Sequence, residues 1–186
     1  MEGSFTDFQP KSLNPDNINF TFDPSLILTL KKIGFNIFNL ANNHSLDFGE
    51  KGFTQSQTYL KNNNIDYFGS PLNNNHLSVI KNIRGIKIGF IGYNEFAKSD
   101  FNEILEEIKK IKQETDFTVV YAHWGIEYQA TFSKIQQGEA HQFIDAEAFW
   151  GRAYSATGQG RIIQRVRIPP RKVSQPPGSE SLEGGR

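Results

Sequence analysis

The chain has 186 residues, of which 37% are hydrophobic, which is enough apolar material for one ordinary globular domain. Its 20 basic and 20 acidic residues cancel, which argues against nucleic acid or an anionic membrane surface as a partner. The absence of cysteine excludes disulfides, thiolate metal sites and a thiol nucleophile. No apolar run is long enough to cross a bilayer, and the polar opening Met1–Ser4 is unlike a signal peptide. We therefore expect a soluble chain without a membrane segment.

The first 149 residues predict helices and strands in alternation. In chain order we expect a helix at 24–32, a strand at 35–40, a helix at 50–61, a short strand at 65–69, a hairpin of strands at 76–82 and 86–93, a helix from 101, a strand at 116–122 and a helix at about 132–148. The first helix should turn Leu26, Ile27 and Leu30 inward. Helices interleaved with strands indicate an α/β fold, with the apolar strand 86–93 at its centre.

The composition changes sharply near residue 150. Residues 1–149 hold sixteen Asn, twelve Lys and one Arg, whereas residues 150–186 hold no Asn, one Lys and six Arg. The second segment is rich in Gly, Pro, Ser and Gln, which is typical of disorder. We therefore predict one domain over 1–149 and a disordered tail over 150–186. The tail is either a natural linker or a non-native continuation introduced by a frame change or a junction.

Polar side chains follow the predicted strand at 35–40. Taken alone, Asn42-Asn43-His44 is typical of a turn, because Asn tolerates left-handed backbone and bonds its own main chain. Directly after an apolar strand, however, polar side chains lie where open α/β sheets gather their chemistry. There the amide oxygen of Asn43 can ligate a cation, while the His44 ring can hold an oxyanion or pass a proton. Asp47 is placed to accept a hydrogen bond from His44 and to fix its tautomer.

A second histidine, His123, follows the strand at 116–122, so two strands deliver imidazoles to one edge. Neutral imidazole is a common metal ligand; the alternative is a core histidine hydrogen-bonded beside Trp124. Glu127 is either a further ligand or substrate contact, or an exposed loop carboxylate, which is the commoner state. We expect His76 and His141 at the surface.

Two motifs carry a resemblance to a known family. They are Ala41-Asn42-Asn43-His44-Ser45-Leu46-Asp47-Phe48-Gly49, followed by Gly52, and Ala122-His123-Trp124-Gly125-Ile126-Glu127-Tyr128. In this order, with a strand-rich middle, they resemble the CapA family of bacterial capsule and poly-γ-glutamate synthesis proteins. The similarity covers nearly all of residues 1–149. It implies an α/β, metallophosphoesterase-like sandwich of mixed β-sheet layers covered by helices.

The resemblance also implies roles for particular residues. The opening segment is similar to the family's Asn-Leu-Glu segment, which places Glu2 at its acidic position. Family position implies that Glu2, Asn43 and His123 hold a divalent metal ion. It also implies that His44 contacts a phosphate-like group, and we expect His44 and its hydrogen-bond partner Asp47 to be the catalytic residues. The remaining candidates are substrate contacts: Asn42, Trp124 and Glu127.

Two parts of the family pattern have no match here. In the family an early strand ending in Gly-Asp precedes the position of Glu2. In the family a late strand ending in a Gly-His-x-Pro-His-like motif follows the helix that matches residues 136–146. We therefore expect an incomplete metal site and an unpaired edge in the sheet.

Three functions remain open at this point. The first is a metal-dependent hydrolase acting on a phosphoester or allied bond, and the second is a non-catalytic accessory that holds an anionic polymer such as poly-γ-glutamate. The third is an inactive fragment. Resemblance to the family implies involvement in capsule or poly-γ-glutamate synthesis at the cell envelope, with other capsule-synthesis proteins as partners.

Overall fold

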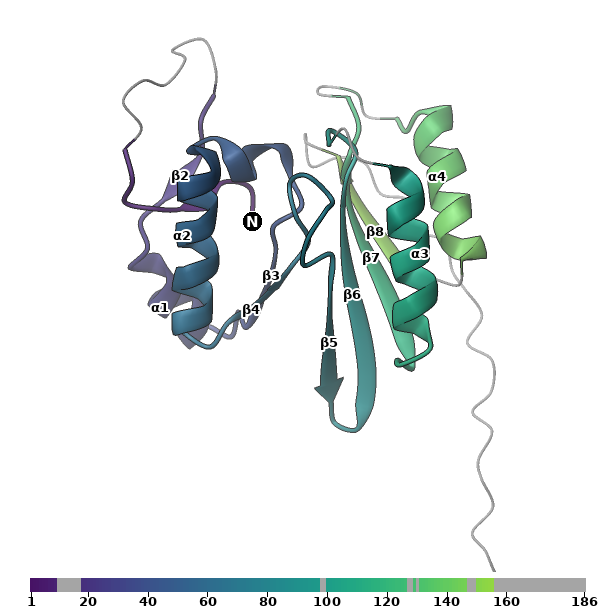
Figure 1. Ribbon diagram of the computed structural model, residues 1–186, viewed down its shortest axis with the longest axis horizontal. Coiled ribbons are helices and arrows are strands. Elements are labelled where there is room, and N and C mark those ends of the chain that lie inside the picture. The colour runs from purple at the N-terminus through teal and green to yellow at the C-terminus, as the bar shows by residue number, and fades with distance from the viewer. Residues whose placement is uncertain (10–17, 98–99, 127–128, 130, 147–149, 156–186) are drawn as a thin grey trace, which may run out of the picture.

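A computed structural model describes residues 1–9, 18–97, 100–126, 129, 131–146 and 150–155. The elements are β1 (Ser4–Phe5), β2 (Thr21–Phe22), α1 (Leu26–Lys32), β3 (Ile37–Asn39), the 3₁₀ helix η1 (Asn43–Leu46), α2 (Gly49–Asn62), β4 (Asp66–Phe68), β5 (Ser78–Ile83), β6 (Ile86–Asn94), α3 (Phe101–Lys112), β7 (Phe117–Trp124), α4 (Lys134–Asp145) and β8 (Trp150–Ser155). They form a sandwich in which α1 and α2 cover strands β3 and β4, while α3 and α4 cover the sheet β5–β8 (Figure 1). The predicted α/β sandwich of mixed sheets covered by helices is thus confirmed.

The four-stranded sheet has the order β5-β6-β7-β8. β5 and β6 are antiparallel, whereas β7 and β8 both run parallel to β6. The predicted hairpin is confirmed: Ile83 pairs with Ile86, and the two residues between them, Arg84 and Gly85, have φ of 54° and 86°. Positive φ at both central positions is the geometry of a tight type I′ turn. Strand β6 lies inside the sheet, as its apolar sequence predicted.

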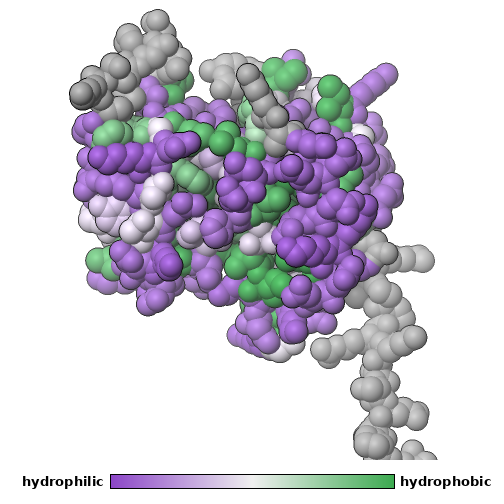
Figure 2. Space-filling view, in the orientation of Figure 1, coloured by the Kyte–Doolittle hydropathy of each residue, from purple (hydrophilic) through white to green (hydrophobic). Residues whose placement is uncertain are grey.

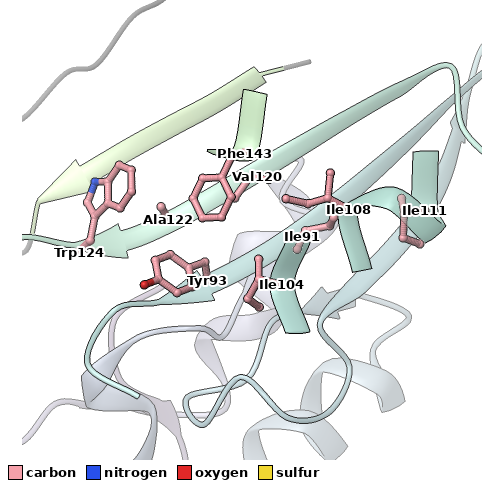
Figure 3. Packing of buried hydrophobic residues seen from close by; sticks show 9 residues of the cluster. All are labelled: Ile91, Tyr93, Ile104, Ile108, Ile111, Val120, Ala122, Trp124 and Phe143. Carbon is pink, nitrogen blue, oxygen red and sulfur yellow. The ribbon is translucent and has the colours of Figure 1, made fainter. Parts of the chain in front are cut away.

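Two apolar cores hold the layers together. The first lies among β1, β3, α1 and α2 and consists of Phe5, Ile27, Phe38, Leu40, Leu60 and Ile65. The second lies between strands β6 and β7 and helices α3 and α4, and its nine residues are labelled in Figure 3. Helix α3 contributes Ile104, Ile108 and Ile111, which recur at helical spacing and are all buried. Its N-cap is Asp100, whose side chain accepts a hydrogen bond from the backbone N–H of Asn102.

The two sheet layers approach each other closely at a pair of glycines. A Cβ atom built on Gly92 of β6 would lie 2.6 Å from the Cα atom of Gly69 and 2.5 Å from Oδ1 of Asn39. Next to this point the rings of Phe68 and Phe90 lie 5.8 Å apart. The close approach brings the carboxyl end of β3 toward those of β6 and β7.

Two expectations from the sequence are corrected. Helix α1 begins at Leu26, after a turn that contains Pro24, and the Leu26 side chain is 44% exposed whereas Ile27 is fully buried. Adjacent helical residues point about 100° apart, so Ile27 faces the core and Leu26 does not. Residues 150–155, which we expected to be disordered, form β8, with Trp150 paired to Val119 of β7. The rest of the predicted tail, 156–186, lies outside the described residues.

The surface is mostly hydrophilic, and apolar residues show between the polar ones in separate patches (Figure 2). Among the residues whose exposure the structure describes, the large apolar side chains with the greatest exposure are Ile18, Ile33 and Ile135. Within the described part of the chain, no helix has the length and apolar character needed to cross a bilayer.

Candidate metal site

Side chains from two distant segments meet at the carboxyl ends of β3 and β7. Asn43 begins η1, which follows β3, and His123 lies next to the end of β7. The Nε2 atom of His123 lies 2.8 Å from the Oδ1 atom of Asn43, across 80 residues of sequence. An amide oxygen can only accept a hydrogen bond, so Nε2 of His123 carries the proton in this contact. The predicted convergence of these two residues is therefore present.

The turn that carries the Asn-Asn-His motif is built by Asn42. Its backbone is extended and its Oδ1 atom accepts a hydrogen bond from the N–H of His44 at 3.1 Å. Its Nδ2 atom donates to the carbonyl of Met1 at 2.8 Å, and the residue is 2% exposed. Ser45 adds a bond from its hydroxyl to the carbonyl of Leu40. Asn42 thus shapes the turn, and both ends of its amide are bonded within the protein, so the expected substrate contact does not fit its position.

His44 is oriented by Asp47, as predicted. Nδ1 of His44 lies 2.9 Å from Oδ2 of Asp47, and the same oxygen accepts the backbone N–H of Phe20 at 2.7 Å. A carboxylate accepts hydrogen bonds, so Nδ1 of His44 is the protonated nitrogen and Nε2 is free to accept a proton. The ring of Phe20 packs edge-on against the imidazole with centroids 4.5 Å apart.

Glu2 brings a carboxylate to the same place. Its Oε1 atom lies 3.8 Å from Nε2 of His44 and 4.0 Å from Nε2 of His123. The Glu2 side chain is 41% exposed, whereas those of His44 and His123 are 15% and 7% exposed. Glu2 therefore lies at the mouth of the cluster, with the two imidazoles behind it.

The imidazole of His123 is neutral over the physiological range. Burial lowers the pKa of His123 from its usual 6.5 to about 4, and positive charge on His44 acts in the same direction. A neutral ring with its lone pair on Nε2 is the form that binds a metal. Binding at Nε2 therefore requires the ring proton to move to Nδ1, which breaks the hydrogen bond to Asn43.

The structure places the Trp124 side chain away from this cluster. Trp124 is 3% exposed and packs in the second core, where its ring stacks on Phe143 at 6.1 Å. Successive residues of a strand face opposite sides, so the ring next to His123 points away from the site. A substrate contact at Trp124 does not fit that placement. Glu127 lies outside the described residues. His76 and His141 are exposed, as predicted.

Sequence reasoning missed two side chains near His123. Phe96 is 47% exposed and its ring lies 5.8 Å from the His123 imidazole. Glu95 bonds the backbone on both sides of Trp124: its N–H donates to the carbonyl of His123, and its Oε2 accepts the N–H of Gly125. Both residues directly follow β6, so the strand-end rule applied to the first two motifs would have found them.

The donor set of the cluster fits a divalent cation. The oxygens of Asn43 and Glu2 and the neutral imidazole of His123 are donors that such cations accept. Among the residues that the structure describes, no three His, Cys, Asp or Glu side chains form a group that could hold a metal ion. A site here therefore depends on the Asn43 amide oxygen as well as on charged groups.

Comparisons with known proteins identify the family of the chain. The family described as "Bacterial capsule synthesis protein PGA_cap" matches residues 1–151. The "Capsule biosynthesis protein CapA" of Bacillus anthracis is 28% identical over 152 residues, which cover 71% of this chain and 37% of that protein. The "PGA biosynthesis protein CapA" of Bacillus subtilis (strain 168) is 25% identical over 140 residues, covering 66% of this chain and 37% of the relative. The chain thus spans little more than a third of the length of these relatives. The family match over residues 1–151 shows that the chain belongs to the PGA_cap family of bacterial capsule synthesis proteins.

Proposed function

We propose that this chain acts in capsule or poly-γ-glutamate biosynthesis at the cell envelope and contributes a divalent-cation site to that process. Family membership and the names of the two Bacillus relatives support the biological process. The observation that carries the site is the contact between Asn43 and His123, at 2.8 Å, with His44 and Glu2 beside it. Asn43 and His123 are 80 positions apart in the sequence, so it is the fold that brings them into contact.

Asn43, His123 and Glu2 would hold the cation, and their carboxylate, amide and imidazole donors suit it. When bound, a divalent cation lowers the pKa of a coordinated water and polarises a phosphoryl oxygen. His44 offers its Nε2 lone pair to a proton of the attacking water, because Asp47 keeps the proton of the neutral ring on Nδ1. Asp47 also stabilises the imidazolium that forms when Nε2 is protonated. This chemistry fits hydrolysis of a phosphoester or an allied bond.

A second candidate is binding of an anionic polymer without turnover. It is favoured by the small donor set, since the described residues provide no group of three His, Cys, Asp or Glu ligands. A weakly held cation can still bridge the protein to the carboxylates of poly-γ-glutamate, and in that case no bond is cleaved.

One experiment separates the two candidates. The full chain is assayed with Mn²⁺ for hydrolysis of p-nitrophenyl phosphate and for binding of poly-γ-glutamate, beside His44→Ala and the exposed-histidine control His141→Ala. Mn²⁺-dependent hydrolysis that is lost in His44→Ala and kept in His141→Ala supports the hydrolase. Mn²⁺-dependent polymer binding without hydrolysis supports the second candidate. Absence of both activities in the folded wild-type chain contradicts the proposal.

A further inference from the structure

Glu95 forms two hydrogen bonds at the end of β7, one with each sequence neighbour of Trp124. The pairing of β6 with β7 sets Asn94 opposite His123, so Glu95 is the first residue beyond the ladder. Its backbone N–H donates to the carbonyl oxygen of His123 at 3.0 Å. Its carboxylate oxygen Oε2 accepts the N–H of Gly125 at 2.7 Å. One residue therefore holds the chain before and after the point where β7 ends.

The second bond lies where the chain leaves the strand. Gly125 has a φ of 106°, a conformation that side-chain-bearing residues rarely adopt, so the backbone turns away immediately after Trp124. The N–H of Gly125 lies past the β6–β7 pairs, which end at His123. A charged acceptor makes a stronger hydrogen bond than a neutral one. The Glu95 carboxylate thus fixes the turn that follows the metal-site histidine.

We propose that Glu95 is a positioning residue for His123. Its carboxylate holds the end of β7 so that Nε2 of His123 reaches Oδ1 of Asn43, and it sets the affinity of the site for a divalent cation without being a ligand. The part of this inference that concerns cation affinity rests on the proposed function. The part that concerns the His123–Asn43 contact does not.

The neighbouring Glu139 provides a matched control. It lies on α4, and its Oε1 atom lies 3.1 Å from the hydroxyl of Tyr93. The charge of Glu95 acts on the pKa of Glu139, and the bond of Glu139 is to a residue of the second core. Glu139→Gln therefore removes a nearby carboxylate without removing the acceptor of the Gly125 N–H.

The test compares the wild-type chain with Glu95→Gln, Glu95→Ala and Glu139→Gln. Gln keeps an oxygen acceptor for Gly125, whereas Ala keeps only the backbone bond to His123. We measure the Nε2–H resonance of His123 by ¹H–¹⁵N NMR in metal-free protein, and the Kd for Mn²⁺ by calorimetry. Thermal unfolding checks that each variant is folded. If Glu95→Ala does not fold, Glu95→Asp replaces it, because the shorter Asp side chain does not reach the N–H of Gly125.

We expect Glu95→Ala to shift or broaden the Nε2–H resonance and to raise the Kd for Mn²⁺ about tenfold, as is common when a supporting hydrogen bond is lost. Glu139→Gln should keep both values close to wild type, and Glu95→Gln, whose neutral oxygen makes the weaker bond to Gly125, should lie between wild type and Glu95→Ala. Unchanged resonance and affinity in Glu95→Ala, or the same losses in Glu95→Gln as in Glu95→Ala, would overturn the inference. If the wild-type chain binds no Mn²⁺, the proposed function fails, and the metal-free NMR comparison still decides the role of Glu95.

Discussion

Acid should destabilise the fold through His123, and the size of the effect can be worked out. His123 is 6% exposed, and burial lowers its pKa from 6.5 to about 4. In the unfolded chain the ring has its ordinary pKa of 6.5. Between pH 6.5 and pH 4 the unfolded state therefore binds a proton at this ring, whereas the folded state does not. The linked stability is therefore full above pH 6.5 and is lost as the pH falls toward 4. The loss reaches about 3 kcal/mol in total, and about 2 kcal/mol of it falls between pH 7 and pH 5.

The half-buried Glu139 affects the pH dependence of stability with the opposite sign. Burial raises the pKa of Glu139, with the charge of Glu95 acting in the same direction, while its bond to Tyr93 opposes them. For a carboxyl with a raised pKa, the folded state binds more protons than the unfolded state. Acidification through that window therefore adds stability. The pH profile of the wild-type chain alone mixes the two effects, so the contribution of His123 requires a comparison with a variant.

The suitable variant is His123→Gln, because Gln does not titrate. Urea unfolding is followed at pH 7 and pH 5 in the presence of EDTA for the wild type, His123→Gln and the exposed-histidine control His141→Gln. We expect the free energy of unfolding to fall by about 2 kcal/mol more in the wild type than in His123→Gln, and His141→Gln should follow the wild type. Equal losses in the wild type and His123→Gln would refute the reasoning.

Three further predictions concern other parts of the structure. Asn43→Ala leaves the buried Nε2–H of His123 without its acceptor and should cost about 1–3 kcal/mol in urea unfolding at pH 7; no loss would mean that the 2.8 Å contact is not formed in solution. Ile108→Ala removes a fully buried side chain between α3 and the sheet, and should cost about 2–5 kcal/mol in the same assay. Gly92→Ala should separate the two sheet layers and lower the thermal unfolding temperature, because its Cβ would lie 2.6 Å from a backbone atom. Gly138 lies on helix α4, where an added Cβ would meet no atom within 4 Å, so Gly138→Ala should raise the unfolding temperature. A rise in Gly92→Ala as well would contradict the close packing of the two sheet layers at Gly92.

Much of the site could be predicted because its signals are local. Asn43, His44 and Asp47 follow one apolar strand and His123 follows another, so the strand-end rule identified them from neighbouring residues alone. The bond between His44 and Asp47 spans three positions and needed no knowledge of the fold. The place of Glu2 depends on contacts that no local pattern encodes, and it came from the family resemblance.

The errors also have physical causes. Trp124 was expected to contact substrate, but it adjoins His123 on β7, and adjacent residues of a strand face opposite sides. The segment 150–155 was expected to be disordered because the whole stretch 150–186 is poor in apolar residues. Its pairing with β7 uses backbone hydrogen bonds, which depend little on composition.

The position of a bound cation is the most direct test of the proposed site at Asn43 and His123. Crystals of the wild-type chain soaked in Mn²⁺ can be measured at a wavelength where manganese scatters anomalously. We expect one anomalous peak within ligand distance of Oδ1 of Asn43 and Nε2 of His123, with the hydrogen bond between them broken. A peak elsewhere, or none at saturating Mn²⁺ with the Asn43–His123 hydrogen bond intact, would contradict the proposed site.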